Sequence, residues 1–269
     1  MRLKDKKLFL LDMDGTIYLD DRLFDGTTEF LQYIKQTEGR YLFLTNNSSK
    51  GVNAYVEKLN KLGIEAKPED FLTSVDATAA ILKERYGRDY ESRKIYVLGT
   101  ESFRNQMIAE GFLVTTEPDE DVKTLLIGFD RELTYKKLED ACILLGREVE
   151  YFATNPDWVC PTEFGSVPDC GSMCQMLEHA TGRMPHFIGK PQPDMALMAM
   201  LKTGYKAEEA ILVGDRLYTD IACGVNAGID TCFVLSGEGT LADIEKYNIN
   251  PTYILEDIKE LLRRIKNEA

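Results

Sequence analysis

Long apolar stretches are what this sequence most clearly lacks. Only about five apolar residues precede Asp12, whereas a membrane span needs about 20 and a signal peptide needs a continuous apolar region. We therefore predict a cytoplasmic protein with no membrane partner.

Histidine and positive charge are also scarce. The two histidines, His179 and His186, give little support to a serine–histidine–aspartate mechanism. With 32 Lys and Arg against 45 Asp and Glu, the net charge is −13, which repels polyanions and argues against nucleic acid as a partner. Small anions stay compatible with this charge, because a metal ion, a lysine and backbone N–H groups act at short range.

Cysteine spacing typical of a disulfide framework or a zinc site is absent. Cys170 and Cys174 are separated by three residues and have no matching pair elsewhere among the six cysteines. We expect buried free thiols. The chain is 44% apolar and has no low-complexity tract, which is typical of a globular protein.

Short apolar runs, each ending in polar or small residues, alternate with segments of helical spacing. Such runs are typical of buried parallel strands, and the alternation predicts an α/β fold. The runs are Leu8–Leu11, Tyr41–Leu44, Ile95–Leu98, Leu125–Ile127, Ile211–Val213 and Cys232–Leu235.

The polar strand ends are concentrated in two parts of the chain. Residues 1–78 and 186–269 carry them, whereas 79–185 mostly do not. We therefore predict one domain built from the two outer parts, with residues 79–185 inserted as a second domain.

The first apolar run leads directly into Asp12-Met13-Asp14-Gly15-Thr16. Alternate residues of a strand point to the same side, and ligands of open α/β sheets bind at the carboxyl ends of strands. Asp12 and Asp14 are therefore candidate catalytic residues. The alternative for such an isolated motif is a turn in which Asp serves local hydrogen bonding.

Two further clusters could bind an anion. Thr45-Asn46-Asn47-Ser48-Ser49 follows the second apolar run; it could simply cap the next helix, but hydroxyls and free N–H groups at a helix start also bind phosphate. Lys190 lies between Gly189 and Pro191 at a predicted strand end. Most lysines are solvated surface charges, yet an ammonium held there could neutralise phosphate oxygens.

The last cluster, Gly214-Asp215 followed by Asp220, comes after the apolar run Ile211–Val213. Asp220 alone could be a helix cap or a partner of the helix dipole. Asp215, however, adds a third carboxylate at a strand end, and converging carboxylates need a cation.

In this order the four clusters resemble the haloacid dehalogenase superfamily. The chain is most similar to its NagD-like phosphatases with a type IIA cap, through motifs spread over essentially the whole sequence. These are Asp12–Thr16, Thr45–Ser48, Ala153–Asp157, Gly189–Pro191, Gly214-Asp215 and Thr219–Ile221.

The resemblance implies a doubly wound, Rossmann-like core with an inserted α/β cap that selects the substrate. It also implies an aspartyl-phosphate on Asp12, with Asp14 as general acid and then base. Mg²⁺ would be held by Asp12, the main-chain carbonyl of Asp14 and Asp215. Phosphate would be bound by Thr45, Asn46 and Lys190, and Asp220 would orient the metal ligands.

The expected partner is a small phosphomonoester such as a sugar phosphate or a nucleotide. Two alternatives stay open: phosphotransfer to an acceptor other than water, and a phospho-aspartate switch protein. The family resemblance also leaves a homodimer open. We expect the loop Asn155–Trp158 and the turn Pro168–Ser172 near the leaving group, with Trp158 either in the cap core or on the substrate.

Overall fold

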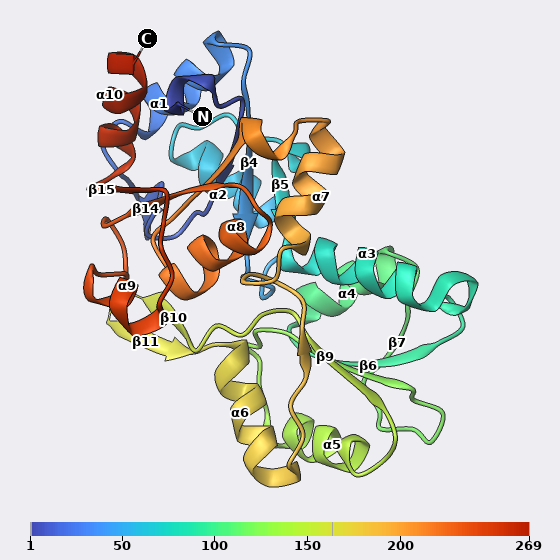
Figure 1. Cartoon of the computed structure of the whole chain (residues 1–269). Coiled ribbons are helices and arrows are strands. Elements are labelled where there is room, and N and C mark those ends of the chain that lie inside the picture. Colours follow the sequence, from blue (N-terminus) through green and yellow to red (C-terminus); the bar gives the residue numbers. More distant parts are fainter. Residues whose placement is uncertain (1, 163, 269) are drawn as a thin grey trace. The chain divides into compact units, whose positions relative to one another are not determined.

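The chain folds into two compact units. A computed structural model describes residues 2–162 and 164–268; Met1, Glu163 and Ala269 lie outside the described residues. The first unit comprises Met1–Thr45, Tyr55–Leu72 and Lys190–Ala269, and the second comprises Asn46–Ala54 and Thr73–Gly189 (Figure 1).

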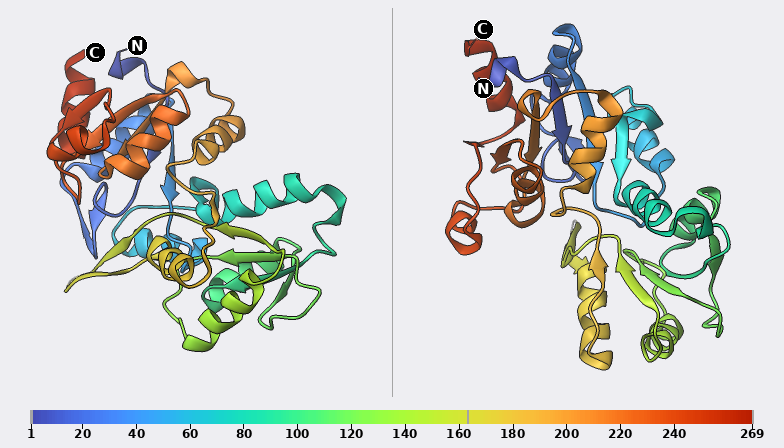
Figure 2. Two further views of the ribbon diagram at one scale, coloured as in Figure 1. Left: turned by 60° about the horizontal axis from the view of Figure 1, so that its bottom comes forward. Right: turned by 45° about the vertical axis from the view of Figure 1, so that its right-hand side comes forward.

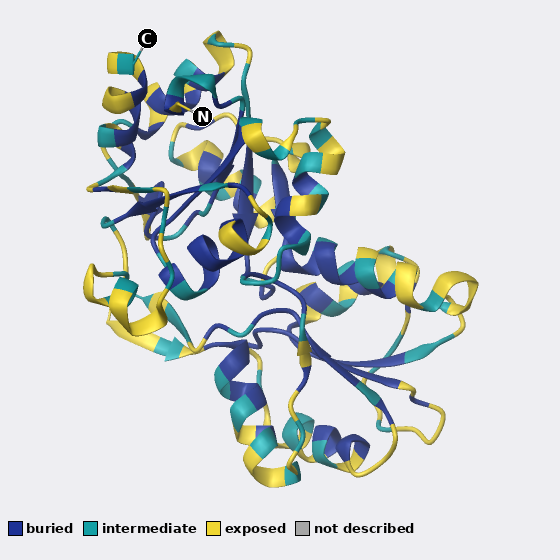
Figure 3. Ribbon diagram, viewed as in Figure 1, coloured by how far each residue is buried: buried dark blue, intermediate teal, exposed yellow. Residues whose placement is uncertain are grey.

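A six-stranded sheet with the strand order β15-β14-β13-β1-β4-β5 forms the centre of the first unit, and its strand pairs from β15 to β4 are parallel. Its strands are mostly buried (Figure 3), as expected of a sheet covered on both faces. They span β1 (Leu8–Leu11), β4 (Arg40–Thr45), β5 (Phe71–Thr73), β13 (Ala210–Gly214), β14 (Asp230–Val234) and β15 (Tyr253–Leu255).

Helices cover both faces of this sheet. One face carries α1 (Thr27–Gln36) and α10 (Ile258–Glu268), which contact each other, and the other carries α7 (Asp194–Thr203) and α8 (Ala222–Asn226) (Figure 2). The short helix α9 (Ala242–Tyr247) precedes β15. A small hairpin, β2 (Tyr18–Leu19) and β3 (Arg22–Leu23), follows β1. Helix α2 (Val52–Lys61) contains residues of both units.

The second unit has its own five-stranded sheet, ordered β12-β9-β8-β6-β7 and parallel throughout. Helices α3 (Ser74–Tyr86) and α4 (Glu101–Ala109) lie on one face, and α5 (Tyr135–Leu145) and α6 (Cys170–Thr181) on the other (Figure 1). Its strands are β6 (Lys94–Leu98), β7 (Leu113–Thr115), β8 (Thr124–Ile127), β9 (Glu150–Ala153) and β12 (His186–Phe187), and β10 (Val159–Thr162) with β11 (Gly165–Pro168) forms a separate hairpin.

The predicted α/β class with a doubly wound parallel sheet is confirmed, and all six apolar runs form strands. One strand joins a different sheet than expected: β12, which ends three residues before Lys190, pairs with β9 in the second unit. The second unit also takes in residues 46–54, 73–78 and 186–189. The division into a core and an inserted cap stays a prediction.

Several smaller expectations can be compared with side-chain exposure. In the described part of the chain none of the six cysteines forms a disulfide, and four of them are buried. Trp158 has 48% of its surface exposed, so it is not part of the core of the second unit. Within residues 2–162 and 164–268, no helix combines the length and the apolar character that crossing a bilayer requires.

Candidate active site

Parallel pairing brings two of the predicted acidic residues to one edge of the first sheet. Leu11 of β1 lies opposite Val213 of β13, and the amide of Asp12 extends this ladder by donating to Val213 O at 2.9 Å. Each strand is buried over its whole length, so its first polar side chain is delivered where the strand ends. Asp12 and Asp215 therefore converge at the carboxyl end of the sheet.

Lys190 forms the central contact of the site. Its side chain is 2% exposed, and its Nζ lies 2.6 Å from Asp12 Oδ1, 2.7 Å from Asp220 Oδ1 and 3.2 Å from the main-chain oxygen of Leu44. Burial alone would lower the pKa of Lys190, but the charges of Asp12 and Asp220 outweigh it and raise the pKa. The ammonium is therefore charged at neutral pH, and it connects the residue after β1, the last part of β4 and the turn before α8.

Asp220 is held from both sides. Its Oδ2 accepts a hydrogen bond from the amide of Arg216 at 3.0 Å, within the π-helical turn Leu217–Ile221 that precedes α8. A β-carbon on Gly214 would lie 2.3 Å from the Asp220 β-carbon, so only glycine fits there. This explains why glycine ends β13.

Three carboxylates lie close together, two of them buried and that of Asp12 partly buried. Oxygens of Asp12, Asp215 and Asp220 all lie within 4.8 Å of one another. Lys190 supplies one positive charge against three carboxylates, so the ionised cluster is left with excess negative charge. Buried charges of one sign are unfavourable unless a cation compensates them.

Asp215 has the side chain in this cluster that is best suited to binding a cation. Its side chain is buried, and its Oδ1 has no hydrogen-bond partner among the described residues, whereas its Oδ2 accepts from the amide of Glu238 at 2.7 Å. Burial, and then the charge of Asp220, raises the pKa of Asp215 to about 7. An orphaned carboxylate oxygen beside two further carboxylates suits a hard divalent cation such as Mg²⁺.

The same environment acts on Asp12. Burial raises the pKa of the Asp12 carboxyl, the charge of Asp220 raises it further, and Lys190 opposes both effects. Thr16 is fully buried and donates a long hydrogen bond of 3.5 Å to Asp12 Oδ2. Among the described residues, one oxygen of Asp12 is thus fixed by the lysine, and the other has only this weak contact.

The glycine-rich loop Ser236–Gly239, which follows β14, contacts Asp215 through its main chain. Besides the amide of Glu238, the amide of Gly239 donates to Asp215 O at 3.1 Å, and Ser236 Oγ donates to Gly15 O at 2.7 Å. A β-carbon on Gly237 would lie 2.0 Å from Asp215 Oδ2. The loop therefore approaches the carboxylate more closely than any side-chain-bearing residue could.

Asp14 lies in a different environment from Asp12. The chain after Asp14 turns back, with Gly15 N donating to Tyr18 O at 2.8 Å, and this brings the Tyr18 hydroxyl 3.4 Å from Asp14 Oδ2. Lys58 of α2 places its Nζ 3.8 Å from Asp14 Oδ1. With its side chain 42% exposed, Asp14 can exchange protons with water or a bound ligand.

Thr45 and Asn46, the predicted phosphate-binding residues, belong to different units of the structure. Thr45 is the buried last residue of β4, in the first unit. Asn46 belongs to the second unit, where its Nδ2 donates to Asp157 Oδ1 at 3.3 Å and its main-chain oxygen accepts from Asn155 Nδ2 at 2.8 Å and Ser74 Oγ at 2.7 Å. Their phosphate-binding roles stay predictions.

Sequence reasoning did not single out Lys58, Tyr18 or the loop Ser236–Gly239. The loop carried a signal, because two glycines flank Glu238 directly after a predicted strand. No sequence signal pointed to Tyr18 or Lys58. The position of Tyr18 depends on how the chain turns back after Gly15, and that of Lys58 depends on the rotation of α2 about its axis.

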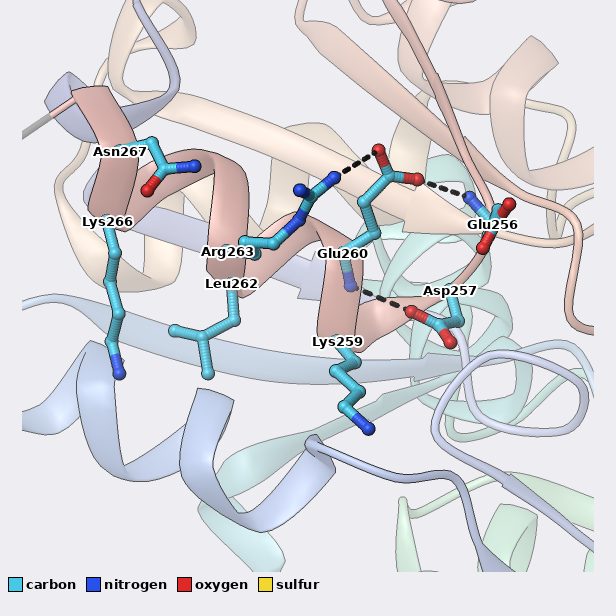
Figure 4. A pocket seen from close by; sticks show the side chains of 8 residues that line it. All are labelled: Glu256, Asp257, Lys259, Glu260, Leu262, Arg263, Lys266 and Asn267. Atoms are coloured by element: carbon cyan, nitrogen blue, oxygen red, sulfur yellow. Dashed lines mark hydrogen bonds and ion pairs between the residues drawn. The ribbon is translucent and has the colours of Figure 1, made fainter.

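A hollow of about 730 Å³ beside α10 contains none of these site residues. Figure 4 shows Lys259, Leu262 and Lys266 extending from one side of the helix, while Arg263 pairs with Glu260 at 3.4 Å. This is a mostly charged helix surface. The candidate site is therefore defined by its clustered side chains and not by this hollow.

Two family models match the chain. The haloacid dehalogenase-like hydrolase model covers residues 9–113, and a second model, described as HAD-hydrolase-like, covers residues 187–261. The acid sugar phosphatase of Staphylococcus aureus strain USA300 is 34% identical over 98% of this chain and 100% of its own length. The chain belongs to the haloacid dehalogenase-like hydrolases.

Similar solved structures identify the group within the haloacid dehalogenase-like hydrolases to which the chain belongs. A 4-nitrophenylphosphatase from Thermotoga maritima matches with a TM-score of 0.89 at 40% identity, covering 97% of this chain and 98% of that one. A protein described as a nagD protein matches with a TM-score of 0.88 at 39% identity, covering 98% of each chain. The chain is accordingly an enzyme, a phosphatase of the NagD-like group.

A third solved structure bears on the cation. The glycerol phosphate phosphatase of Mycobacterium tuberculosis, solved in complex with magnesium, has a TM-score of 0.88 at 29% identity, covering 97% of this chain and 78% of that one. The same enzyme has also been solved with calcium. Both ions take oxygen ligands, which is the donor set of the carboxylate cluster.

Gly237→Ala tests whether the loop after β14 shapes the cation site. The added β-carbon must displace Asp215 or the loop, so we expect a loss of about 1–3 kcal/mol of stability and weaker Mg²⁺ binding. The measurement is the rise in melting temperature on adding Mg²⁺. Gly146→Ala is the control, because its nearest contact would be an ordinary 3.4 Å; an unchanged Mg²⁺ response in Gly237→Ala would contradict the close approach.

Asp215→Asn separates the stability of the fold from cation binding. At pH 8, above the raised pKa of Asp215, an ionised carboxylate there favours the unfolded state. Removing this charge should therefore increase the free energy of unfolding in EDTA by roughly 1–4 kcal/mol, which appears as a higher melting temperature. It should also abolish the rise in melting temperature on adding Mg²⁺. A variant that melts below the unsubstituted protein in EDTA would contradict this account of the cluster.

Proposed function

We propose that the protein is a Mg²⁺-dependent phosphomonoester hydrolase that acts on a small phosphorylated metabolite through an aspartyl-phosphate on Asp12. The observation that carries the proposal is the Asp12 carboxylate, held 2.6 Å from the buried ammonium of Lys190, beside the orphaned oxygen of Asp215. This arrangement combines a fixed nucleophile, a positive charge for phosphate oxygens and ligands for a cation.

In the first step a carboxylate oxygen of Asp12 attacks phosphorus, and the bond from phosphorus to the ester oxygen breaks. Asp14 gives its proton to that leaving oxygen, so the alcohol departs neutral. Lys190 offsets the negative charge shared by nucleophile and phosphoryl group. Thr45 and Asn46 bind the phosphoryl oxygens in this proposal.

In the second step water attacks the phosphorus of the aspartyl-phosphate. Ionised Asp14 takes a proton from this water, and the bond from phosphorus to Asp12 breaks. Inorganic phosphate leaves, while Asp12 is again a carboxylate and Asp14 is again protonated. The exposure of Asp14 suits it to this contact with water.

Asp12, Asp215 and the main-chain carbonyl of Asp14 would hold Mg²⁺, and Asp220 would orient these ligands. When bound, the ion reduces the repulsion between the attacking carboxylate and the phosphate dianion. The magnesium complex of the Mycobacterium tuberculosis relative supports this choice of metal.

The substrate is proposed only as a class. The relatives named above are a sugar phosphatase, a 4-nitrophenylphosphatase and a glycerol phosphate phosphatase, which supports a small phosphomonoester. The second unit would act as the cap that selects among such substrates, with Asn155–Trp158 and Pro168–Ser172 near the leaving group. A cytoplasmic location, the absence of a nucleic-acid partner and a homodimer stay predictions.

Asp12→Asn should abolish turnover while the fold stays intact, because the amide is a poor nucleophile and cannot form the aspartyl-phosphate. The experiment measures inorganic phosphate released from a panel of phosphomonoesters, with Mg²⁺ and with EDTA. Asp25→Asn, at an exposed position, is the control. Retained turnover in Asp12→Asn would exclude the nucleophile, and phosphate recovered on an organic acceptor would indicate phosphotransfer instead of hydrolysis.

Asp14→Asn should lower kcat by about 10²–10⁴, the usual contribution of general acid–base catalysis. Because the substitution keeps the main-chain carbonyl, the melting-temperature rise with Mg²⁺ should persist. The measurement is steady-state kinetics with an alkyl phosphate, whose leaving oxygen needs a proton. An unchanged kcat would rule out the proton role.

A further inference from the structure

Asp14 belongs to a group of three side chains that contact one another. Lys58 Nζ lies 3.8 Å from Asp14 Oδ1 and 3.7 Å from the centre of the Tyr18 ring, and the Tyr18 hydroxyl lies 3.4 Å from Asp14 Oδ2. Each oxygen of the carboxylate thus faces one of two side chains that also contact each other. All three belong to the first unit.

Such support matters because of where Asp14 lies. The Asp12 side chain is 14% exposed and is held by a lysine at 2.6 Å, but the Asp14 side chain is 42% exposed and follows the end of a strand. Without fixed neighbours an exposed carboxylate samples several rotamers. A proton donor must lie within hydrogen-bond reach of the leaving oxygen, and small misplacements of a catalytic group are costly.

Lys58 differs from an ordinary surface lysine. Its side chain is 25% exposed, and its ammonium lies over the face of a tyrosine that is itself fully buried. The attraction between a cation and an aromatic face fixes the ammonium above the ring. Lys61, one turn further along α2, is exposed.

We propose that Lys58 is a positioning residue for Asp14: held over the Tyr18 ring, its ammonium fixes the carboxylate where it exchanges a proton with the leaving oxygen and then with water. The inference rests on the proposed role of Asp14 and goes beyond it. Lys58 itself neither gives nor takes a proton in either step. Tyr18 acts as the platform for Lys58 and as a second donor to the carboxylate.

The first test compares kinetic constants. Lys58→Met keeps an unbranched side chain as far as the ε position and removes the charged ammonium; we expect kcat to fall by about 10- to 100-fold with little change in KM. Lys58→Arg, which can also stack on tyrosine and pair with a carboxylate, should recover most of the activity. Lys61→Met is the matched control on the same helix and should leave both constants unchanged.

The second test asks whether Lys58 acts through Asp14. Lys58→Met should have almost no further effect in an Asp14→Asn background, because the group that it positions is already gone. Tyr18→Phe keeps the ring and loses only the hydroxyl, so its loss of kcat should be smaller than that of Lys58→Met. Lys58→Gln, which also removes the ammonium, serves as the second variant if Lys58→Met proves unstable on heating.

Three results would overturn the inference. An equal loss of kcat from Lys58→Met in both backgrounds would show that Lys58 acts independently of Asp14. A rise in KM with unchanged kcat would indicate that Lys58 contacts the substrate. A kcat of Lys58→Arg as low as that of Lys58→Met would show that the positive charge is not what positions Asp14. None of these results contradicts the proton role of Asp14. That role would be contradicted by an unchanged kcat in the single variant Asp14→Asn.

Discussion

The rest of the site depends on the contact between Lys190 and two carboxylates. A lysine ammonium that is 2% exposed needs partners, and Asp12 and Asp220 supply them at 2.6 and 2.7 Å. Asp220 is buried as well, whereas the Asp12 side chain keeps 14% of its surface exposed. Since Asp215 adds a further carboxylate, the group is compensated in full only when a cation joins it. The protein thus keeps an unfavourable charge in its interior, which is typical of a site shaped for binding and not for stability.

Packing around these carboxylates restricts the backbone. Gly214 and Gly237 come so close to Asp220 and Asp215 that a β-carbon would overlap them. Gly15, with φ at +86°, meets Asp215 in the same way. Glycine is therefore required at three separated points of the chain by one cluster of charges, which links the loop after β14 to the loop after β1.

Most of the fold and the centre of the site could be predicted from the sequence, because both follow from local patterns. Apolar runs gave the strands, and polar residues directly after those runs gave Asp12 and Asp215. The strand before Lys190 was harder: it has two residues, and its pairing with β9 depends on distant parts of the chain. Lys58 and Tyr18 were not predictable, because no spacing indicates that a helix and a hairpin meet at Asp14.

The two aspartates of the first motif are two residues apart, yet the structure gives them opposite surroundings. Asp12 is enclosed by charged groups and held by one short contact, which suits an atom that must attack along a defined line. Asp14 is partly exposed and held by longer contacts to Lys58 and Tyr18, which suits a group that must meet a leaving oxygen and then a water molecule. Two identical side chains can therefore take different parts in one reaction, because the protein sets the environment of each separately.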